Sequence, residues 1–296
     1  MAQSNALESQ PRFGETARKD TWWLGPLATF LGLSAFIVYS TWAGMTGKYF
    51  EIRQDQTGFS GHEVAPYLSP FYAPLIYDAQ SPHAWFKAAQ PGWWPSWFPM
   101  FSSAILILWG PALFRLTCYY YRKAYYRSFW ADPLACAVGE PRKSYWGENS
   151  LPLILQNAHR FAMYVAVVFL ALLWWDALHA FCWPADASGK YLNGEHQFGM
   201  GLGTLVMLLN VVFLSCYTFG CHSLRHLVGG RMDCFSCIAT GQNKEKLHPG
   251  YHAWRFTSLL NEHHMLWAWC SLCSVGLTDV YIRLCSMGII HDVRFF

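Results

Sequence analysis

Five long apolar stretches constrain this chain more than any other feature of its sequence. A helix needs roughly 20 apolar residues to cross the hydrocarbon core of a bilayer. Helices and closed barrels are the structures that satisfy every backbone polar group in lipid. The pattern therefore predicts an all-α integral membrane protein, a bundle of five transmembrane helices. The predicted spans are Leu24–Met45, Trp97–Tyr121, and, approximately, Leu153–Trp183, Phe198–Leu227 and His263–Met287.

The composition agrees with a membrane protein. Charged residues make up 13% of the chain, whereas soluble domains carry about 25%. Sixteen tryptophans are many for 296 residues, and Trp is enriched at membrane–water interfaces. The net charge of +3 is small, so we expect membrane lipid and no nucleic acid among the partners.

The distribution of Lys and Arg predicts the orientation. Five of them lie in the loop 122–152 and four in the loop 228–262, against three in the longer segment 47–99. Because cytoplasmic loops are enriched in these residues, we expect both loops and the tail 1–23 to be cytoplasmic. Residues 24–296 would then form one multi-pass domain in the cell membrane.

The segment 47–99 is predicted to lie outside the cell. It is rich in Pro and aromatic residues, which is typical of short helices and turns along a membrane surface. We expect it to be a structural lid without chemistry of its own.

One stretch, GCHSLRHLVGGRMDCFSC at 220–237, is dense in side chains that bind metals. His222 and His226 are four residues apart, so they share one face of a helix. The pair Gly229–Gly230 ends that helix and lets the chain turn back. The two imidazoles can then bind one metal ion together.

Two cysteines complete the candidate metal site. Cys234 and Cys237 form a C-x-x-C, a spacing at which two thiolates converge on one metal. Two His and two Cys are the ligands of a Rieske-type [2Fe–2S] cluster and also of structural zinc. Cys221 is the substitute ligand, although neighbours on a helix diverge by about 100°, which separates it from His222.

Histidines near the spans leave a haem as an alternative. His159, His222 and His264 lie near the predicted cytoplasmic ends of the third, fourth and fifth spans. Facing helices of a bundle can supply axial His ligands to a b-type haem. The first two spans contain no His, so at most one bis-His haem is expected near that side, or one more involving His179.

A quinone site needs a polar pocket with aromatic walls at the membrane boundary. The stretch 248–264, HPGYHAWRFTSLLNEHH, lies at that depth. These side chains equally suit the anchoring of an interfacial helix. The quinone-binding candidates are Arg225, Tyr251, His252, Trp254 and Arg255.

Asp176 and Asp279 lie toward the outer ends of their spans. They could pair with water or with Arg283, and they are assigned no chemistry.

With five spans, an inside N-terminus and histidines in the last three, the chain resembles the membrane anchors of succinate dehydrogenase and fumarate reductase. More narrowly, GCHSLRH followed by GGRMDCFSC is similar to the SdhC-like membrane subunit of actinobacterial complex II. The resemblance runs from the first span to Cys285. Two-haem anchors carry haem ligands on their first two helices, and this chain has no His there. The actinobacterial subgroup implies a Rieske-type [2Fe–2S] cluster, which agrees with the set of two His and two Cys.

The resemblance also implies a role. A flavoprotein subunit would oxidise succinate, and a soluble iron–sulfur subunit would pass the electrons to this chain, which performs no succinate chemistry itself. The cluster would relay them to a quinone, which we expect to be menaquinone. The whole complex could form a higher oligomer. Two alternatives remain: the same anchor role with a b-type haem, and a non-redox membrane scaffold with a structural metal.

Overall fold

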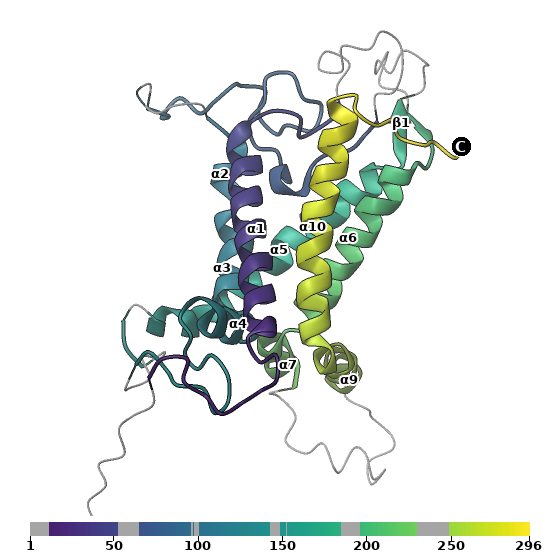
Figure 1. Cartoon of the computed structure of the whole chain (residues 1–296). Helices are drawn as coiled ribbons and strands as arrows, with labels where there is room; N and C mark the ends of the chain where they lie inside the picture. Colours follow the sequence, from purple (N-terminus) through teal and green to yellow (C-terminus); the bar gives the residue numbers. More distant parts are fainter. Residues whose placement is uncertain are drawn as a thin grey trace, which may run out of the picture. The chain divides into compact units, whose positions relative to one another are not determined.

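The computed structural model describes most of the chain and divides it into two compact units. Unit 1 comprises Met1–Ile37 and Arg115–Ala158, and unit 2 comprises Val38–Phe114 and His159–Phe296. Both are mainly helical (Figure 1). The residues described are 12–52, 65–95, 97, 101–142, 149–151, 153–184, 196–229 and 249–296.

Four helices in the described chain are long and apolar enough to cross a membrane. They match the first, third, fourth and fifth predicted spans, because an uninterrupted apolar run forms a helix whose backbone groups are all paired internally. A 3-10 turn, Leu153–Ala158, leads directly into the second of them. The four are α1 (Leu24–Thr46), α5 (His159–His179), α6 (Leu202–Phe219) and α10 (His264–Ser286).

The second predicted span is broken into shorter helices. It contains α2 (Ser103–Ile107) and α3 (Trp109–Thr117), and α4 (Tyr119–Phe129) follows. Pro111 has no N–H to donate to the carbonyl of Ile107, and its ring crowds that carbonyl, so a helix is interrupted there. This segment is not among the four candidate spans, and the count of five stays a prediction.

In unit 2, α6 packs against both α5 and α10 (Figure 1). Leu170, Met207 and Ile282 belong to the buried core that these helices share. Because lipid offers no hydrogen-bond partner, a pair of polar side chains that bond to each other can stabilise such a bundle. Ser274 Oγ donates to Asn210 Oδ1 at 2.9 Å, which links α10 to α6.

A two-stranded antiparallel sheet departs from the all-α expectation. Strand β1 (Cys182–Pro184) pairs with β2 (His196–Phe198), and Trp183 lies opposite Gln197. The third span is predicted to reach Trp183, but α5 ends at His179. Pro184 disfavours a helical conformation at the residue before it, which explains the extended backbone there.

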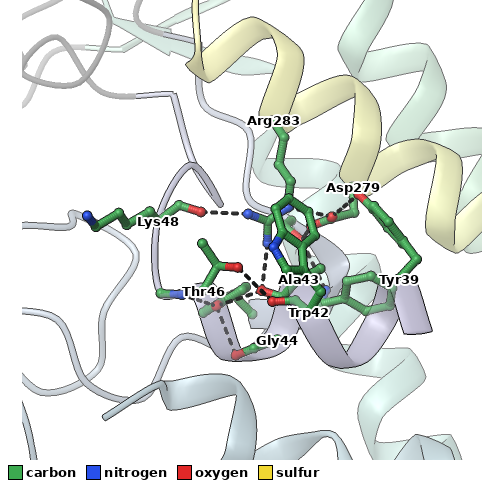
Figure 2. Close-up of polar contacts among 12 residues, drawn as sticks. Tyr39, Trp42, Ala43, Gly44, Thr46, Lys48, Asp279 and Arg283 are labelled. Carbon is green, nitrogen blue, oxygen red and sulfur yellow. Dashed lines mark hydrogen bonds and ion pairs between the residues drawn. The ribbon is translucent and has the colours of Figure 1, made fainter. Parts of the chain in front are cut away.

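A buried ion pair joins α10 to the end of α1 and to the segment that follows it (Figure 2). Arg283 Nε donates to Asp279 Oδ2 at 2.7 Å, and both side chains are almost fully buried. Arg283 also donates to the carbonyls of Ala43 and Lys48, at 2.8 and 2.6 Å. Tyr39 and Ser69 donate their hydroxyls to the Asp279 carboxylate. The pairing of Asp279 with Arg283, one of the two options raised from the sequence, is therefore present.

The other described parts of the predicted outer segment form turns, isolated bridges and one short 3-10 helix, Pro70–Tyr72. This agrees with the predicted short helices and turns.

In unit 1, the Tyr126 hydroxyl of α4 donates to Gln156 Oε1 at 2.6 Å. The predicted division into a tail, 1–23, and one membrane domain, 24–296, stays a prediction.

Candidate metal centre

The helix predicted to run to Leu227 ends earlier, at a turn. α6 stops at Phe219, and a separate helix, α7 (His222–Gly229), begins after it. A Cβ on Gly220 would lie 2.8 Å from the Cys216 carbonyl oxygen and 3.1 Å from that of Leu260, so a glycine is needed here.

Helix α9 (Pro249–Glu262) holds this turn in place. Asn261 Nδ2 donates to the Gly220 carbonyl at 2.7 Å. α7 itself packs against α9, and Figure 1 shows both near the end of α10 that begins at His264. The described part of α7 runs to Gly229, and the end of the helix at the pair Gly229–Gly230 stays a prediction.

His222 and His226 face each other on α7. Their Nε2 atoms are 3.2 Å apart and their rings lie at 82°. Both residues are exposed. Two nitrogens each bound at about 2.1 Å to one tetrahedral metal lie about 3.4 Å apart. The pair thus has the spacing of two ligands on one metal ion, which fits the predicted role.

The electrostatics of this pair favour the form of imidazole that binds metals. Partial burial lowers the pKa of His222 below its ordinary value, and the neighbouring His226 and Arg225 lower it further. A lowered pKa keeps the ring neutral at neutral pH. Because metal-bound histidine must be deprotonated at the ligating nitrogen, the ring is ready to bind.

Cys221 lies on a different face from this pair. Its side chain is buried, at 1% exposure, and its Sγ is 3.2 Å from Nε2 of His159 at the start of α5. The divergence predicted for adjacent helical residues is therefore observed. As a substitute ligand, Cys221 would place its sulfur inside the bundle, away from His222.

The three histidines of the haem alternative do not meet at one point. His159 stacks on Phe114 at 5.0 Å, and His264 stacks on Tyr217 at 5.1 Å. Phe114 and Tyr217 contact each other edge-on, so two aromatic rings connect the imidazoles, whereas His222 faces His226. Within the described chain, no group of three or more His, Cys, Asp or Glu is arranged to hold a metal.

The two cysteines predicted to complete the metal site belong to the predicted loop that follows α7. Cys234, Cys237 and Gly230 fall outside the described residues. Their roles as ligands and as the end of the turn stay predictions.

The quinone candidates fall on α7 and α9, which pack together. The Arg225 guanidinium lies 5.4 Å above the Trp254 ring, and its Nε donates to Ser258 Oγ at 2.9 Å. Tyr251 contacts both His252 and Trp254 through its ring. The structure thus brings four of the five candidates together in pairs, and His252 and Arg255 are both exposed on α9.

Sequence reasoning missed two rings of this region, Phe114 and Tyr217. Phe114 comes from α3 and Tyr217 from the apolar body of α6, so local spacing gives no signal that they meet two histidines. The turn at Gly220 could have been found, because a glycine at the end of a long apolar run marks a helix end.

Comparison with protein families identifies the chain. Residues 24–288 match the family described as actinobacterial succinate dehydrogenase subunit SdhC. The chain belongs to this family. The resemblance drawn from GCHSLRH and GGRMDCFSC is confirmed at the level of the SdhC family.

A solved structure supports the SdhC assignment. The chain is similar to one chain of the Mycobacterium smegmatis Sdh1 complex in the apo form, with 40% sequence identity and a TM-score of 0.76. The match covers 98% of this chain and 97% of that one. No curated protein matches the sequence. As an SdhC-family member with several apolar helices, this chain is a membrane-anchor subunit of succinate dehydrogenase.

Proposed function

We propose that this subunit carries electrons from the soluble iron–sulfur subunit of succinate dehydrogenase to a quinone, through a [2Fe–2S] cluster that it holds itself. His222 and His226 would bind one iron, and Cys234 and Cys237 the other. The observation that carries the proposal is the 3.2 Å separation of the two imidazole Nε2 atoms on α7.

The partners follow from the family. An anchor subunit of succinate dehydrogenase works with the other subunits of that complex in the membrane. The flavoprotein subunit oxidises succinate, and the iron–sulfur subunit would dock where α7 leaves the bundle. The exposed imidazole pair suits that position, because a docked partner would cover it. The excess of Lys and Arg in 122–152 and 228–262 supports a cytoplasmic location for this end and for the N-terminus.

A mixed His/Cys [2Fe–2S] cluster supplies one-electron transfer at a higher potential than an all-Cys centre. The chain's own residues do the positioning. Gly220 and Asn261 fix the start of α7, which sets the direction of His222. His226 follows one turn later on the same face, so neither imidazole has to move to reach a shared iron.

The cysteine next to the pair has a supporting role. Since Cys221 Sγ lies 3.2 Å from His159 Nε2, it packs the turn against α5. This arrangement leaves Cys234 and Cys237 as the preferred sulfur ligands and Cys221 as the substitute.

The quinone, which we take to be menaquinone, would bind beside α9. Arg225 and Trp254 form a cation–π pair there, which offers a flat aromatic wall next to a fixed positive charge. Tyr251 and His252 supply hydrogen-bond donors for a quinone carbonyl. Trp254 anchors the wall of this site, whereas exposed Arg255 is the weakest of the five candidates.

The haem alternative receives less support. The ring of His222 contacts His226, whereas the rings of Phe114 and Tyr217 connect His159 to His264. The non-redox alternative is a structural metal at His222 and His226. This alternative predicts that electron transfer to the quinone continues when both imidazoles are removed.

The test is made on the intact complex with His222→Ala/His226→Ala. We expect succinate oxidation with an artificial dye to be retained, because that chemistry belongs to the soluble subunits. Quinone reduction should fall at least a hundredfold, and the iron content should fall by two atoms per complex. His291→Ala, at an exposed histidine near the C-terminus, is the matched control. Quinone reduction at the parent rate in the double variant would refute the relay.

A further inference from the structure

A cavity with a basic lining lies in unit 1, between α4 and the segment that follows it. It measures about 350 Å³, which is at the lower end of the range of about 300–1,000 Å³ typical of small-molecule sites. Helices α7 and α9, which carry the sites described above, belong to unit 2, so this cavity is built from other residues. Those that matter for its chemistry are Tyr119, Arg122, Lys123, Arg127 and Asp132.

The cations of the cavity come from α4. Tyr119, Lys123 and Arg127 follow one another at intervals of four residues, which places them along one side of the helix. Arg122 is next to Lys123, and its guanidinium lies 5.3 Å from the centre of the Tyr119 ring. Lys123 and Arg127 are both exposed. The helix thus gathers three positive charges on the wall of one cavity.

The segment after α4 is tied to the helix and to the residues before α1. Arg127 Nε donates to the Leu134 carbonyl at 2.7 Å. Arg18 Nη1 donates to the Cys136 carbonyl at 3.0 Å. The cavity is therefore held in shape by contacts of the chain itself, and a ligand that enters it has little ordering to impose.

Positive charge exceeds negative charge in the lining. Among the described residues that line the cavity, Asp132 is the one carboxylate, and its Oδ2 lies 3.6 Å from Arg142 Nη1. The three cations of α4 outnumber it, so an anion is the favoured ligand. Arg binds a phosphate through paired N–H donors, and Lys binds it as a point charge. This combination suits a phosphate group better than a neutral ligand.

The cavity lies near the start of a candidate membrane span (Figure 1). Phe129, the last residue of α4, packs on Phe30 in the second turn of α1, with ring centres 4.8 Å apart. Leu116 and Tyr119, at the other end of α4, are both more than half exposed. An anionic group and an apolar chain can therefore both find partners along this helix.

We propose that this cavity binds the phosphate group of an anionic phospholipid, whose acyl chains lie in the bilayer beside α4 and the start of α1. Basic clusters next to a membrane span attract anionic lipids, and basic pockets bind their phosphate headgroups. A soluble phosphate ester meets the same cations but gains nothing from the apolar surface. A zwitterionic lipid carries a cationic group that the lining repels. The site takes no part in the electron relay proposed above.

The test measures lipid binding to the delipidated, intact complex by native mass spectrometry. The probes are phosphatidylglycerol, phosphatidylcholine with the same acyl chains, and soluble glycerol 3-phosphate. We expect phosphatidylglycerol to bind at least about tenfold more tightly than either of the other two. In Arg122→Gln/Lys123→Gln/Arg127→Gln, its affinity should fall at least about tenfold.

A matched pair of single variants keeps the test decisive if the triple variant does not fold. Lys123→Glu reverses one exposed charge of the lining and should also lower the affinity for phosphatidylglycerol by about tenfold. Lys19→Glu reverses an exposed charge that does not line the cavity, and the affinity should change by less than about twofold because such charges are screened by salt.

Three results would overturn the proposal. The first is equal binding of phosphatidylglycerol by the parent, by Lys123→Glu and by the triple variant. The second is binding of glycerol 3-phosphate as tight as that of the lipid, which would assign the cavity to a soluble phosphate. The third is a parent complex that binds no phosphatidylglycerol while the triple variant loses the soluble subunits, which would assign the cations to an acidic segment of a partner.

Discussion

Two pairs of side chains in this molecule share the same helical spacing and differ in everything else. Asp279 and Arg283 on α10 are four residues apart, as are His222 and His226 on α7. The first pair is buried and makes hydrogen bonds to side chains and carbonyls of the chain around α1 (Figure 2). The second pair is exposed, and its two imidazoles contact each other.

The difference teaches how to read such spacing. An i, i+4 interval brings two side chains together but does not say what they do. Asp279 and Arg283 form an ion pair with each other and are buried, which is the arrangement of a structural contact. His222 and His226 present two ring nitrogens 3.2 Å apart at a surface, which is the arrangement of a ligand site. Substitutions in each pair should therefore affect different properties.

The largest effect is expected from breaking the buried pair. Arg283→Met leaves Asp279 as an unpaired charge inside the bundle, and we expect the free energy of unfolding to fall by about 3–5 kcal/mol. Denaturant titration of the purified chain in detergent, followed by circular dichroism, measures it. The double variant Asp279→Leu/Arg283→Met should lose less than the single one. If the free energy of unfolding of Arg283→Met lies within about 1 kcal/mol of the parent value, the ion pair does not stabilise the fold as described.

The exposed pair should show the opposite behaviour. If both imidazoles bind one iron, His222→Ala alone should lower quinone reduction nearly as much as the double variant, within about twofold, because ligands that act as a unit are not additive. The free energy of unfolding of the metal-free chain should change by less than about 0.5 kcal/mol, as for other surface positions. Multiplicative losses from the two single variants would show that the histidines act independently.

A smaller effect is expected where Cys221 meets His159. Cys221→Ser keeps the size of the side chain and weakens its contact with the imidazole. We expect the cluster to assemble and quinone reduction to fall by no more than about tenfold, as for a residue that supports ligands without binding the metal. Iron analysis and steady-state assays measure both. Loss of two iron atoms per complex in Cys221→Ser would show that Cys221 is a ligand and not only a substitute.

The smallest effect concerns protonation of the exposed pair. The pKa of His222 is lowered from its ordinary value of 6.5, chiefly by partial burial and then by His226. The unfolded chain therefore binds this proton at a higher pH than the folded chain, so stability falls slightly as the pH drops below 6.5 and levels off below the folded pKa.

An NMR titration of 15N-labelled histidine in the metal-free chain should place the His222 midpoint below 6.5. His226→Ala should raise that midpoint, because it removes one of the charges that oppose protonation. A midpoint at or above the ordinary value would contradict the environment described for His222.

Much of the fold could be predicted from the sequence, because four uninterrupted apolar runs have one satisfactory conformation in lipid. The details that differ are local. Pro111 interrupts the second run, as a proline in a helix is expected to do. A Cβ on Gly220 would crowd the carbonyls of Cys216 and Leu260, where α6 ends. Neither the position of α9 against that turn nor the pairing of β1 with β2 is encoded in periodicity.

The candidate site was partly predictable for the same reason. The spacing of His222 and His226 fixes their common face, and the structure agrees. The contact of Cys221 with His159 joins residues 62 positions apart, and the ring contacts of Phe114 and Tyr217 join separate helices. Such long-range contacts depend on how the helices pack, which local pattern does not determine.

The central claim is that His222 and His226 are both ligands of one iron. Pulsed electron paramagnetic resonance of the reduced complex, grown with 15N-labelled histidine, tests it directly. The account predicts a rhombic signal with an average g value below 2 and couplings from two histidine nitrogens. These couplings should disappear in His222→Ala/His226→Ala and persist in His291→Ala. A parent signal without histidine nitrogen couplings, or the same couplings in the double variant, would contradict the account.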